Sequence, residues 1–364
     1  MLEMEGNTVV IAMSGGVDSS VAAALLVEQG YRVIGMMLRL WSEEGKEDQN
    51  RCCTPDAMAL ARRVAAKLGI PFYALDVRDR FKELVVTHFL QGYASGVTPN
   101  PCLKCNRFIR WGVLYEHARS LGANWFATGH YARLRRLESG EVQLLRGLDA
   151  EKDQSYVLSV LPQEQLQHTL FPIGEFHKHE VRELAQRLGL PVAHRPDSQD
   201  LCFLAGGDYR DFLARHAPQV RQPGLIVDRQ GNVLGEHQGL AFYTIGQRKG
   251  LGISSPRPLY VLEKDVYQNR LVVGEEHELG RSNLIANEVN WISGNPPETP
   301  LPVEVKIRYK AREARAVVIP LTSNRVRVQF EYPLRDITPG QQCVFYQGDI
   351  CLGGGIISTE VESA

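Results

Sequence analysis

The segment Ser14 to Ser20, Ser-Gly-Gly-Val-Asp-Ser-Ser, is the sequence feature that most constrains how this chain can fold. It follows the short apolar run of residues 9–13, typical of a strand, and precedes apolar residues 21–27, typical of a helix. Such a turn directs backbone N–H groups and the positive end of a helix dipole towards one point. Gly15 and Gly16 can adopt positive φ, which lets the backbone close around an anion. The segment therefore predicts a phosphate site between a strand and a helix.

The turn lacks the lysine that precedes Ser or Thr in a Walker A loop. Its SGGxDS string resembles instead the pyrophosphate loop of ATP pyrophosphatases, which cleave ATP between the α- and β-phosphates and adenylate a substrate oxygen. The hydroxyls of Ser14, Ser19 and Ser20 would add donors to such a site. An ordinary glycine-containing turn is the alternative, and it accounts less well for the full string at this junction.

Helix-like and strand-like segments alternate through the first half of the chain. Three predicted helices each end in Leu-Gly before a strand-like run; the helices cover residues 55–68, 105–121 and 180–188, and the runs cover residues 70–75, 125–130 and 190–192. This alternation indicates βα units, a parallel sheet and the α/β class. Because ligands bind beyond the carboxyl ends of parallel strands, we expect the Ser14–Ser20 turn, Leu38 and Gly129-His130 on one rim.

The character of the sequence changes after residue 205. A short helix is expected over residues 208–216, a hairpin turn at 228–232 and a glycine-rich basic loop at 246–252. From residue 281 onward, apolar and polar residues alternate with period two, which predicts a small antiparallel barrel. We expect three domains, which cover residues 1–205, 206–280 and 281–364.

The 364 residues carry a formal net charge of −1, which argues weakly against a nucleic-acid partner unless basic residues gather locally. One such group lies in the expected barrel and consists of Lys306, Arg308, Lys310, Arg312 and Arg315. Alternate residues share a strand face, so Lys306, Arg308 and Lys310 are expected to line one surface. A solvated strand face explains the same pattern equally well.

No apolar run approaches the ~20 residues that span a bilayer. The N-terminus lacks the basic and apolar regions of a signal peptide, so a cytoplasmic protein without a membrane partner is expected. The seven cysteines are then read as reduced thiols.

The loop Thr98 to Asn106 contains two prolines and the pair Cys102 and Cys105. We expect Cys105 to begin the following helix, where the helix dipole would favour its thiolate. Three interpretations remain open: Cys105 and Cys202 form a redox pair that handles sulfur; Cys102, Cys105 and Cys202 bind a metal or an iron–sulfur cluster; or the thiols are structural. The adjacent Cys52 and Cys53 receive no role.

Several stretches together resemble the tRNA-specific 2-thiouridylase family, and they occur in the same order along nearly the whole chain. The matching stretches are residues 13–19, Asn100-Pro101 with Cys105-Asn106, residues 127–131, residues 152–156, Asp197-Ser198 with Cys202-Phe203, residues 246–252 and residues 339–341. Each is weak alone, whereas the ordered set is specific.

The resemblance implies a PP-loop domain similar to adenine nucleotide alpha hydrolases, a small, mostly β central domain and a β-barrel. It implies an ATP site made of Ala12, Met13, Ser14, Gly15, Gly16, Val17, Asp18, Ser19, Leu38 and Gly129. It implies that Cys105 is the nucleophile and that Cys202 carries the incoming sulfur as a persulfide. It implies tRNA contacts by Asn100, Pro101, Cys102, His130, Lys152, Asp153, Gln154, Arg308, Tyr309 and Gln341.

The activity implied by the resemblance is ATP-dependent 2-thiolation of the wobble uridine of tRNA, which makes the chain a tRNA-uridine 2-sulfurtransferase. ATP, Mg²⁺, the anticodon stem-loop and a persulfide-carrying donor protein are the expected cofactors and partners. A Cys105–Cys202 disulfide would form during turnover. Many relatives have Asp at the position of Cys102, so this substitution puts the general base in doubt.

Two other function classes share part of these features. An ATP pyrophosphatase that amidates a small acid or nucleotide would need the SGGxDS loop but not two remote cysteines. A non-catalytic RNA-binding module with a structural iron–sulfur site would need the cysteines but no ATP turnover.

Overall fold

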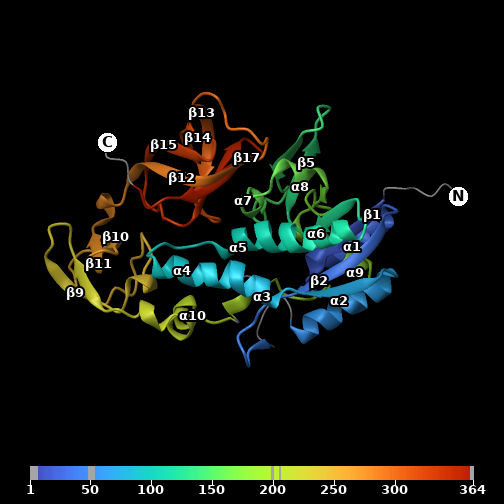
Figure 1. Cartoon of the computed structure of the whole chain (residues 1–364), viewed down its shortest axis with the longest axis horizontal. Coiled ribbons are helices and arrows are strands. Elements are labelled where there is room, and N and C mark those ends of the chain that lie inside the picture. The colour runs from blue at the N-terminus through green and yellow to red at the C-terminus, as the bar shows by residue number, and fades with distance from the viewer. Residues whose placement is uncertain (1–6, 48–53, 198–200, 205, 361–364) are drawn as a thin grey trace.

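The structure is a computed structural model that describes residues 7–47, 54–197, 201–204 and 206–360. Figure 1 shows the parallel sheet at the right, a small β domain at the left and a barrel above them. Among the described residues, none of the helices is long and apolar enough to cross a lipid bilayer.

A five-stranded parallel sheet forms the centre of the first domain and confirms the α/β class. Its strands run in the order β3-β2-β1-β4-β7. They are β1 (Thr8–Ala12), β2 (Arg32–Arg39), β3 (Phe72–Asp76), β4 (Trp125–Thr128) and β7 (Thr169–Leu170). Val9, Val10 and Ile11 of β1 are fully buried, as expected for a central strand covered on both faces.

The strand order reverses at β1, because the chain adds β2 and β3 on one side of it and β4 and β7 on the other. In open α/β sheets, ligands bind at such a reversal, beyond the carboxyl ends of the strands. The turn after β1 leads into α1 (Val17–Glu28), which packs against α2 and α9 (Figure 1). The predicted rim is therefore present, and the Ser14–Ser20 turn lies on it.

Local capping signals explain the helices that the sequence predicts well. Helix α2 (Pro55–Leu68) has the predicted bounds, because Thr54 caps its first turn and Gly69, at φ 67°, ends it. Helices α9 (Lys178–Arg187) and α10 (Tyr209–His216) also lie where helices are expected.

The strand expected at residues 190–192 is wrong. Leu190 N–H bonds back to the Ala185 carbonyl and Pro191 has no N–H, so this segment turns instead of joining the sheet. Leu190 and Val192 are nevertheless buried in the core of the first domain. Their apolar character reflects burial and not a strand.

The helix expected to begin at Cys105 begins at Pro101. It is a continuous run of α5 (Pro101–Lys104), the π-helical η3 (Cys105–Leu114) and α6 (Tyr115–Ser120). Asn100 caps it by accepting the Cys102 N–H at 3.1 Å, and proline suits the first helical position. Cys102 therefore lies in the first turn, and Cys105 lies one turn further in.

The remaining helical elements of the first domain are short. They are α3 (Arg78–Phe81), η2 (Lys82–Thr87), α4 (His88–Ala94), α7 (Ser155–Leu158), α8 (Gln163–Gln167) and η4 (Cys202–Leu204).

The central domain is mostly β, as expected. Its strands β8 (Gly224–Val227), β9 (Val233–His237), β10 (Tyr260–Asp265) and β11 (Arg270–Gly274) pair in the order β10-β11-β8-β9. The predicted turn between β8 and β9 is present, and the Asp228 carboxylate accepts the backbone N–H groups of Gln230 and Asn232.

The C-terminal barrel is antiparallel and closed. Its sheet runs β12-β15-β14-β13-β16-β17, and pairing of β12 with β17 closes it. The strands are β12 (Arg281–Trp291), β13 (Leu301–Lys306), β14 (Ala314–Thr322), β15 (Arg325–Leu334), β16 (Gln342–Gln347) and β17 (Ile350–Ile357). The hairpin of β5 (Ala132–Arg136) and β6 (Val142–Arg146) extends the sheet from β17, so the first domain and the barrel share hydrogen bonds.

The expected common face of Lys306, Arg308 and Lys310 is wrong, because β13 ends at Lys306. The chain then turns, so strand alternation no longer applies. Lys306 lies 3.7 Å from Glu313, whereas the Arg308 guanidinium lies 3.1 Å from the Asp336 carboxylate.

Candidate active site

The turn after β1 has the geometry of an anion cradle. Gly15 has φ 69°, and a Cβ on this residue would lie 2.3 Å from the Ala57 carbonyl oxygen. The N-cap Gly16 supplies no side-chain acceptor, so the first-turn N–H groups of α1 keep their donor capacity for a ligand. The Ser19 hydroxyl accepts the Ser14 N–H at 3.1 Å and stabilises the turn.

The other residues expected at the ATP site lie on the same rim. Gly129, directly after β4, packs so closely on the turn that its Cβ would lie 2.6 Å from the Ser19 nitrogen. Met13 donates its N–H to the Met36 carbonyl at 2.7 Å and aligns the ends of β1 and β2. Ala12 and Leu38 are half-buried at the ends of these strands.

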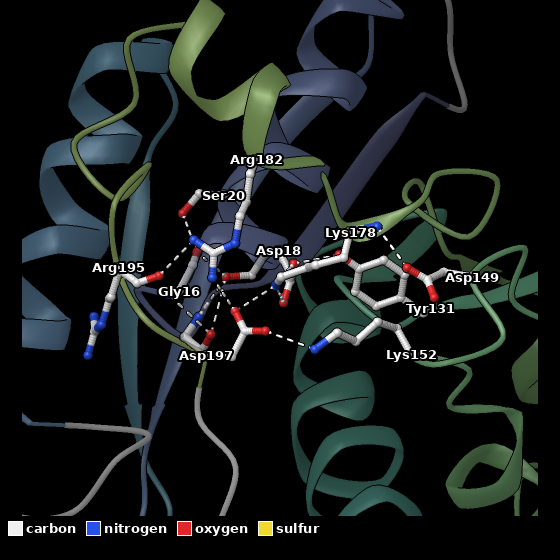
Figure 2. A network of polar contacts seen from close by, with 12 residues as sticks. Gly16, Asp18, Ser20, Tyr131, Asp149, Lys152, Lys178, Arg182, Arg195 and Asp197 are labelled. Carbon is white, nitrogen blue, oxygen red and sulfur yellow. Dashed lines mark hydrogen bonds and ion pairs between the residues drawn. The ribbon is translucent and has the colours of Figure 1, made fainter. Parts of the chain in front are cut away.

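Two carboxylates and a lysine connect the turn to distant segments (Figure 2). The Lys178 ammonium lies 2.7 Å from Asp18 Oδ1 and 2.9 Å from Asp197 Oδ1, and so bridges them. The Tyr131 hydroxyl donates to Asp18 at 2.8 Å. Asp197 also accepts from Lys152 at 3.0 Å and from Arg182 at 2.6 Å.

This network shifts the ionisation of its members. Burial alone would raise the pKa of Asp197, but hydrogen bonds from Lys178 and Lys152 outweigh it and lower the pKa to about 2. The hydrogen bond to Asp197 raises the pKa of Lys152. Burial, together with the Asp18 charge, raises the pKa of Tyr131. Asp197 is therefore ionised and Lys152 protonated at neutral pH.

Sequence reasoning missed three basic residues around this network, Lys178, Arg182 and Arg195, and named Lys152 only as an expected tRNA contact. Lys178 and Arg182 come from α9, and Arg195 donates to the Gly15 carbonyl at 2.7 Å. The available signal was a run of basic residues shortly before Asp197, but the sequence does not show which of them face the turn.

Cys105 and Cys202 pack against the same apolar cluster although they lie far apart in the sequence. Both are half-buried against one apolar cluster, which includes Phe81, Phe89 and Phe203, and Leu38 packs against it too. The cluster thus joins the end of β2 to both thiols. Cys102 is exposed in the first turn of α5.

The structure also bears on the two other interpretations of the cysteines, a metal or iron–sulfur site and structural thiols. In the ranges that the structure describes, no three His, Cys, Asp or Glu side chains are grouped to hold a metal, so the donor set for an iron–sulfur cluster is not assembled. Burial raises the pKa of Cys343 and of Cys351 to about 12, as expected for structural thiols of the barrel. Cys52 and Cys53 lie outside the described residues.

The barrel holds the loop that leads to Cys102. The Gln341 amide donates to the Thr98 carbonyl at 2.7 Å, and the Thr98 N–H donates to the Pro339 carbonyl at 2.9 Å. Asn100 is occupied in capping α5, and Pro101 is buried.

Tyr309 of the barrel lies near this loop and near Lys152. Its side chain is 39% exposed, and its ring lies 6.3 Å from that of Tyr156. Burial raises the pKa of Tyr309, and the charges of Asp153, Lys152 and Cys102 act on it as well. Tyr309 of the barrel thus packs against Tyr156 of the first domain.

Three residues expected to contact tRNA have protein partners instead. His130 is 5% exposed between Thr128, at 2.7 Å, and Arg110, at 2.9 Å, and burial and the Arg110 charge lower its pKa. Asp153 accepts from Gly147 and Ser155, and Gln154 accepts the Tyr131 N–H. Their contacts with tRNA remain predictions that this placement does not support.

One cavity lies away from these residues. It has a volume of about 430 Å³ and lies between the central domain and the barrel, where Arg229, Arg281 and Leu334 are among its lining residues. None of the residues expected at the active site lines it.

Models of three protein families match the chain. A tRNA methyl transferase HUP domain matches residues 7–206, a tRNA methyl transferase PRC-barrel domain matches residues 210–275, and an aminomethyltransferase beta-barrel domain matches residues 281–357.

Curated relatives match over almost the whole chain. A protein of Clostridium perfringens named tRNA-specific 2-thiouridylase MnmA is 47% identical over 98% of this chain and 99% of its own length. Proteins of the same name from Desulfitobacterium hafniense and Heliobacterium modesticaldum are 49% and 50% identical, over 98% and 96% of this chain and 99% and 92% of their own lengths.

Solved structures are more distant. An NMN synthetase from Francisella tularensis aligns with a TM-score of 0.33 and 16% identity, over 58% of this chain and 76% of that one. A 4-thiouridine synthetase–RNA complex with bound ATP aligns with a TM-score of 0.33 and 17% identity, over 59% and 51%. These likenesses are too distant to support an inference about function.

Proposed function

The chain belongs to the tRNA-specific 2-thiouridylase family, and from this membership we propose that it replaces O2 of the wobble uridine of tRNA with sulfur in an ATP-dependent reaction. The observation that carries the proposal is the packing of Cys105 and Cys202 on one cluster beside the rim with the SGGxDS turn. An amidating ATP pyrophosphatase would not need two such thiols.

In the first proposed step, uracil O2 attacks the α-phosphate of ATP. A bond forms between this oxygen and phosphorus, the bond to the bridging oxygen of the β-phosphate breaks, and pyrophosphate leaves. The first-turn N–H groups of α1 and the Ser14 and Ser19 hydroxyls would hold the pyrophosphate and stabilise its charge. Mg²⁺ enters the proposal only as the counterion that commonly accompanies ATP phosphates.

In the second proposed step, sulfur comes from a persulfide on Cys202, which a persulfide-carrying protein has loaded. The Cys105 thiolate attacks Cys202 Sγ, the persulfide S–S bond breaks, and the released hydrosulfide attacks C2 while AMP departs with O2. In a direct variant, the terminal sulfur attacks C2 before Cys105 attacks. Either route leaves a Cys105–Cys202 disulfide, which a dithiol reductant must reduce before the next cycle.

The uridine must leave its stack to reach ATP and Cys105, and the loop around Asn100 would receive it. Cys102 lies in the first turn of α5, beside Asn100 and Pro101, and is proposed to approach the target uridine. Lys152, Arg308, Tyr309 and Gln341 are the proposed contacts to the anticodon stem-loop, and the loop-holding role of Gln341 makes its contribution indirect.

Mass spectrometry of tRNA nucleosides tests this function. Wild-type enzyme incubated with unmodified tRNA, ATP, Mg²⁺ and a persulfide donor is expected to produce 2-thiouridine. Cys105→Ser and Cys202→Ser are each expected to lower the yield more than ~100-fold, because each removes one partner of the sulfur-releasing step. Cys351→Ala, which truncates a thiol buried in the barrel, is the control and is expected to retain the activity. Thiolation by either Ser variant at the wild-type rate would refute the sulfur roles.

A further inference from the structure

Lys178 has no part in the reaction as described so far, yet its ammonium lies against the SGGxDS turn. It is the first residue of α9, and its backbone N–H donates to the Asp149 carboxylate at 2.9 Å, which fixes the start of the helix. The side chain is 12% exposed, and its Nζ lies 2.7 and 2.9 Å from the two oxygens of Asp18 (Figure 2). This cation is therefore held at the mouth of the proposed phosphate cradle.

Positive charge is in excess around this point. Lys152, Lys178 and Arg182 point towards the carboxylates of Asp18 and Asp197 in Figure 2. A fourth basic residue, Arg195, lies on the other side of the turn. The Arg195 guanidinium donates to the Gly15 carbonyl and leaves its charge uncompensated by that bond. An arrangement of this kind favours an anion beside the turn.

Of the four bases, Lys178 is the one whose ammonium contacts Asp18, in the first turn of α1. Lys152 and Arg182 reach Asp197 instead. If the Lys178 ammonium turned to a ligand, Asp18 would keep the Tyr131 hydroxyl at 2.8 Å. Asp197 would keep Lys152 and Arg182, so neither carboxylate would be left unpaired in a partly buried site.

We propose that Lys178 binds the β- and γ-phosphates of ATP and, after adenylation, the departing pyrophosphate. Asp18 and Asp197 hold the ammonium in place before the nucleotide arrives, so that little reorganisation is needed. A lysine suits this task as a compact charge with three donors. The inference rests on the proposed function, because it takes ATP to bind at the SGGxDS turn.

Calorimetric titration of the Lys178→Met variant tests whether Lys178 binds phosphate or only holds Asp18 and Asp197 together. The ligands are α,β-methylene-ATP, which cannot be cleaved at the reacting bond, AMP and inorganic pyrophosphate. We expect the affinity for the ATP analogue and for pyrophosphate to fall ~10- to 100-fold, as for a lost charge-assisted contact. We expect the affinity for AMP to stay within about twofold, because AMP lacks both outer phosphates.

Arg187→Met is the matched control, because it removes one positive charge from the exposed far end of the same helix. It is expected to bind all three ligands like the wild type. Lys178→Arg is expected to recover part of the analogue affinity. If Lys178→Met has a lowered melting temperature, Lys178→Gln is titrated instead, with the same expectation. The Gln amide can still donate hydrogen bonds to the carboxylates of Asp18 and Asp197.

An equal loss for the ATP analogue and AMP, or no loss at all, would overturn the role of Lys178 and leave the thiolation proposal intact. Failure of the wild type to bind the ATP analogue would overturn the proposed function itself, and the inference with it.

Discussion

Asp197 shows how one side chain acquires its properties from partners that the sequence does not identify. Lys178, Lys152 and Arg182 converge on its carboxylate. Burial raises its pKa, but the hydrogen bonds from Lys178 and Lys152 more than offset that effect. The result is a pKa of about 2, below the ordinary value of 3.8. Asp197 therefore fixes three cations near the phosphate cradle and does not serve as a proton donor at neutral pH.

This linkage predicts how stability depends on pH. Because the folded-state pKa of Asp197 is depressed, its stabilisation is fully present above about pH 5 and is lost as pH falls towards 2. Asp197→Asn should lower the free energy of unfolding by about 2 kcal/mol at pH 7, and the difference from wild type should shrink towards pH 3. Urea titrations across this pH range measure it.

Asp211→Asn, at an exposed position on α10, serves as control and should show no such trend. If the free energy of unfolding of Asp197→Asn stayed below that of the wild type by the same amount between pH 7 and pH 3, the low pKa of Asp197 would be contradicted.

At the scale of elements, the cradle depends on how closely α2 approaches the turn after β1. Gly15 meets the Ala57 backbone in the first turns of α2, and its positive φ is strained for any other residue. The shape of the turn is thus set by a neighbouring helix as well as by its own glycines. The position of Cys105 also depends on a residue outside the predicted helix. Asn100 caps the helix at Pro101, so Cys102 and not Cys105 lies in the first turn.

Gly15→Ala should deform the cradle. The added Cβ would lie 2.3 Å from the Ala57 oxygen, and backbone cannot yield as a flexible side chain does. We expect nucleotide affinity to fall at least ~10-fold, because the N–H groups would no longer converge. Gly30→Ala tests the backbone strain alone, since Gly30 has φ 83° with nothing within 4 Å of an added Cβ.

The control substitution, Gly30→Ala, should lower the free energy of unfolding by about 1 kcal/mol and leave the nucleotide affinity unchanged. Equal affinities of the two variants for the ATP analogue would show that the contact with α2 does not shape the site.

At the scale of the whole molecule, several segments join the barrel to the first domain. The β5–β6 hairpin extends the barrel sheet, and Gln341 and Pro339 hold the loop that leads to Cys102. The barrel, which we propose contacts tRNA, therefore also holds the loop that leads to Cys102.

Gln341→Ala should loosen this connection. Loss of the 2.7 Å hydrogen bond to the Thr98 carbonyl is worth about 1 kcal/mol, so the KM for tRNA should rise about fivefold while ATP affinity is retained. Steady-state thiolation kinetics with tRNA as the varied substrate measure the effect. Gln347→Ala is the control, because its amide bonds to Pro302 within the barrel at 3.3 Å.

A KM for tRNA equal to that of the control would mean that the barrel does not position the loop. A parallel loss of ATP affinity would point to general destabilisation.

Local patterns in the sequence were sufficient for much of the architecture. The Leu-Gly ends predicted α2 and the neighbourhood of α9, period-two alternation predicted the barrel, and the SGGxDS string predicted the turn at the rim. These features depend on φ/ψ preferences and on the burial of one face, which neighbouring residues encode.

Only the tertiary structure decided which distant side chains meet. It placed Lys178 between Asp18 and Asp197, packed Cys105 and Cys202 on one apolar cluster, and buried His130 away from the surface. It also ended β13 before Arg308 and made a turn of residues 190–192. Such contacts depend on how whole elements pack, and packing is set by long-range burial that no short segment of the sequence specifies.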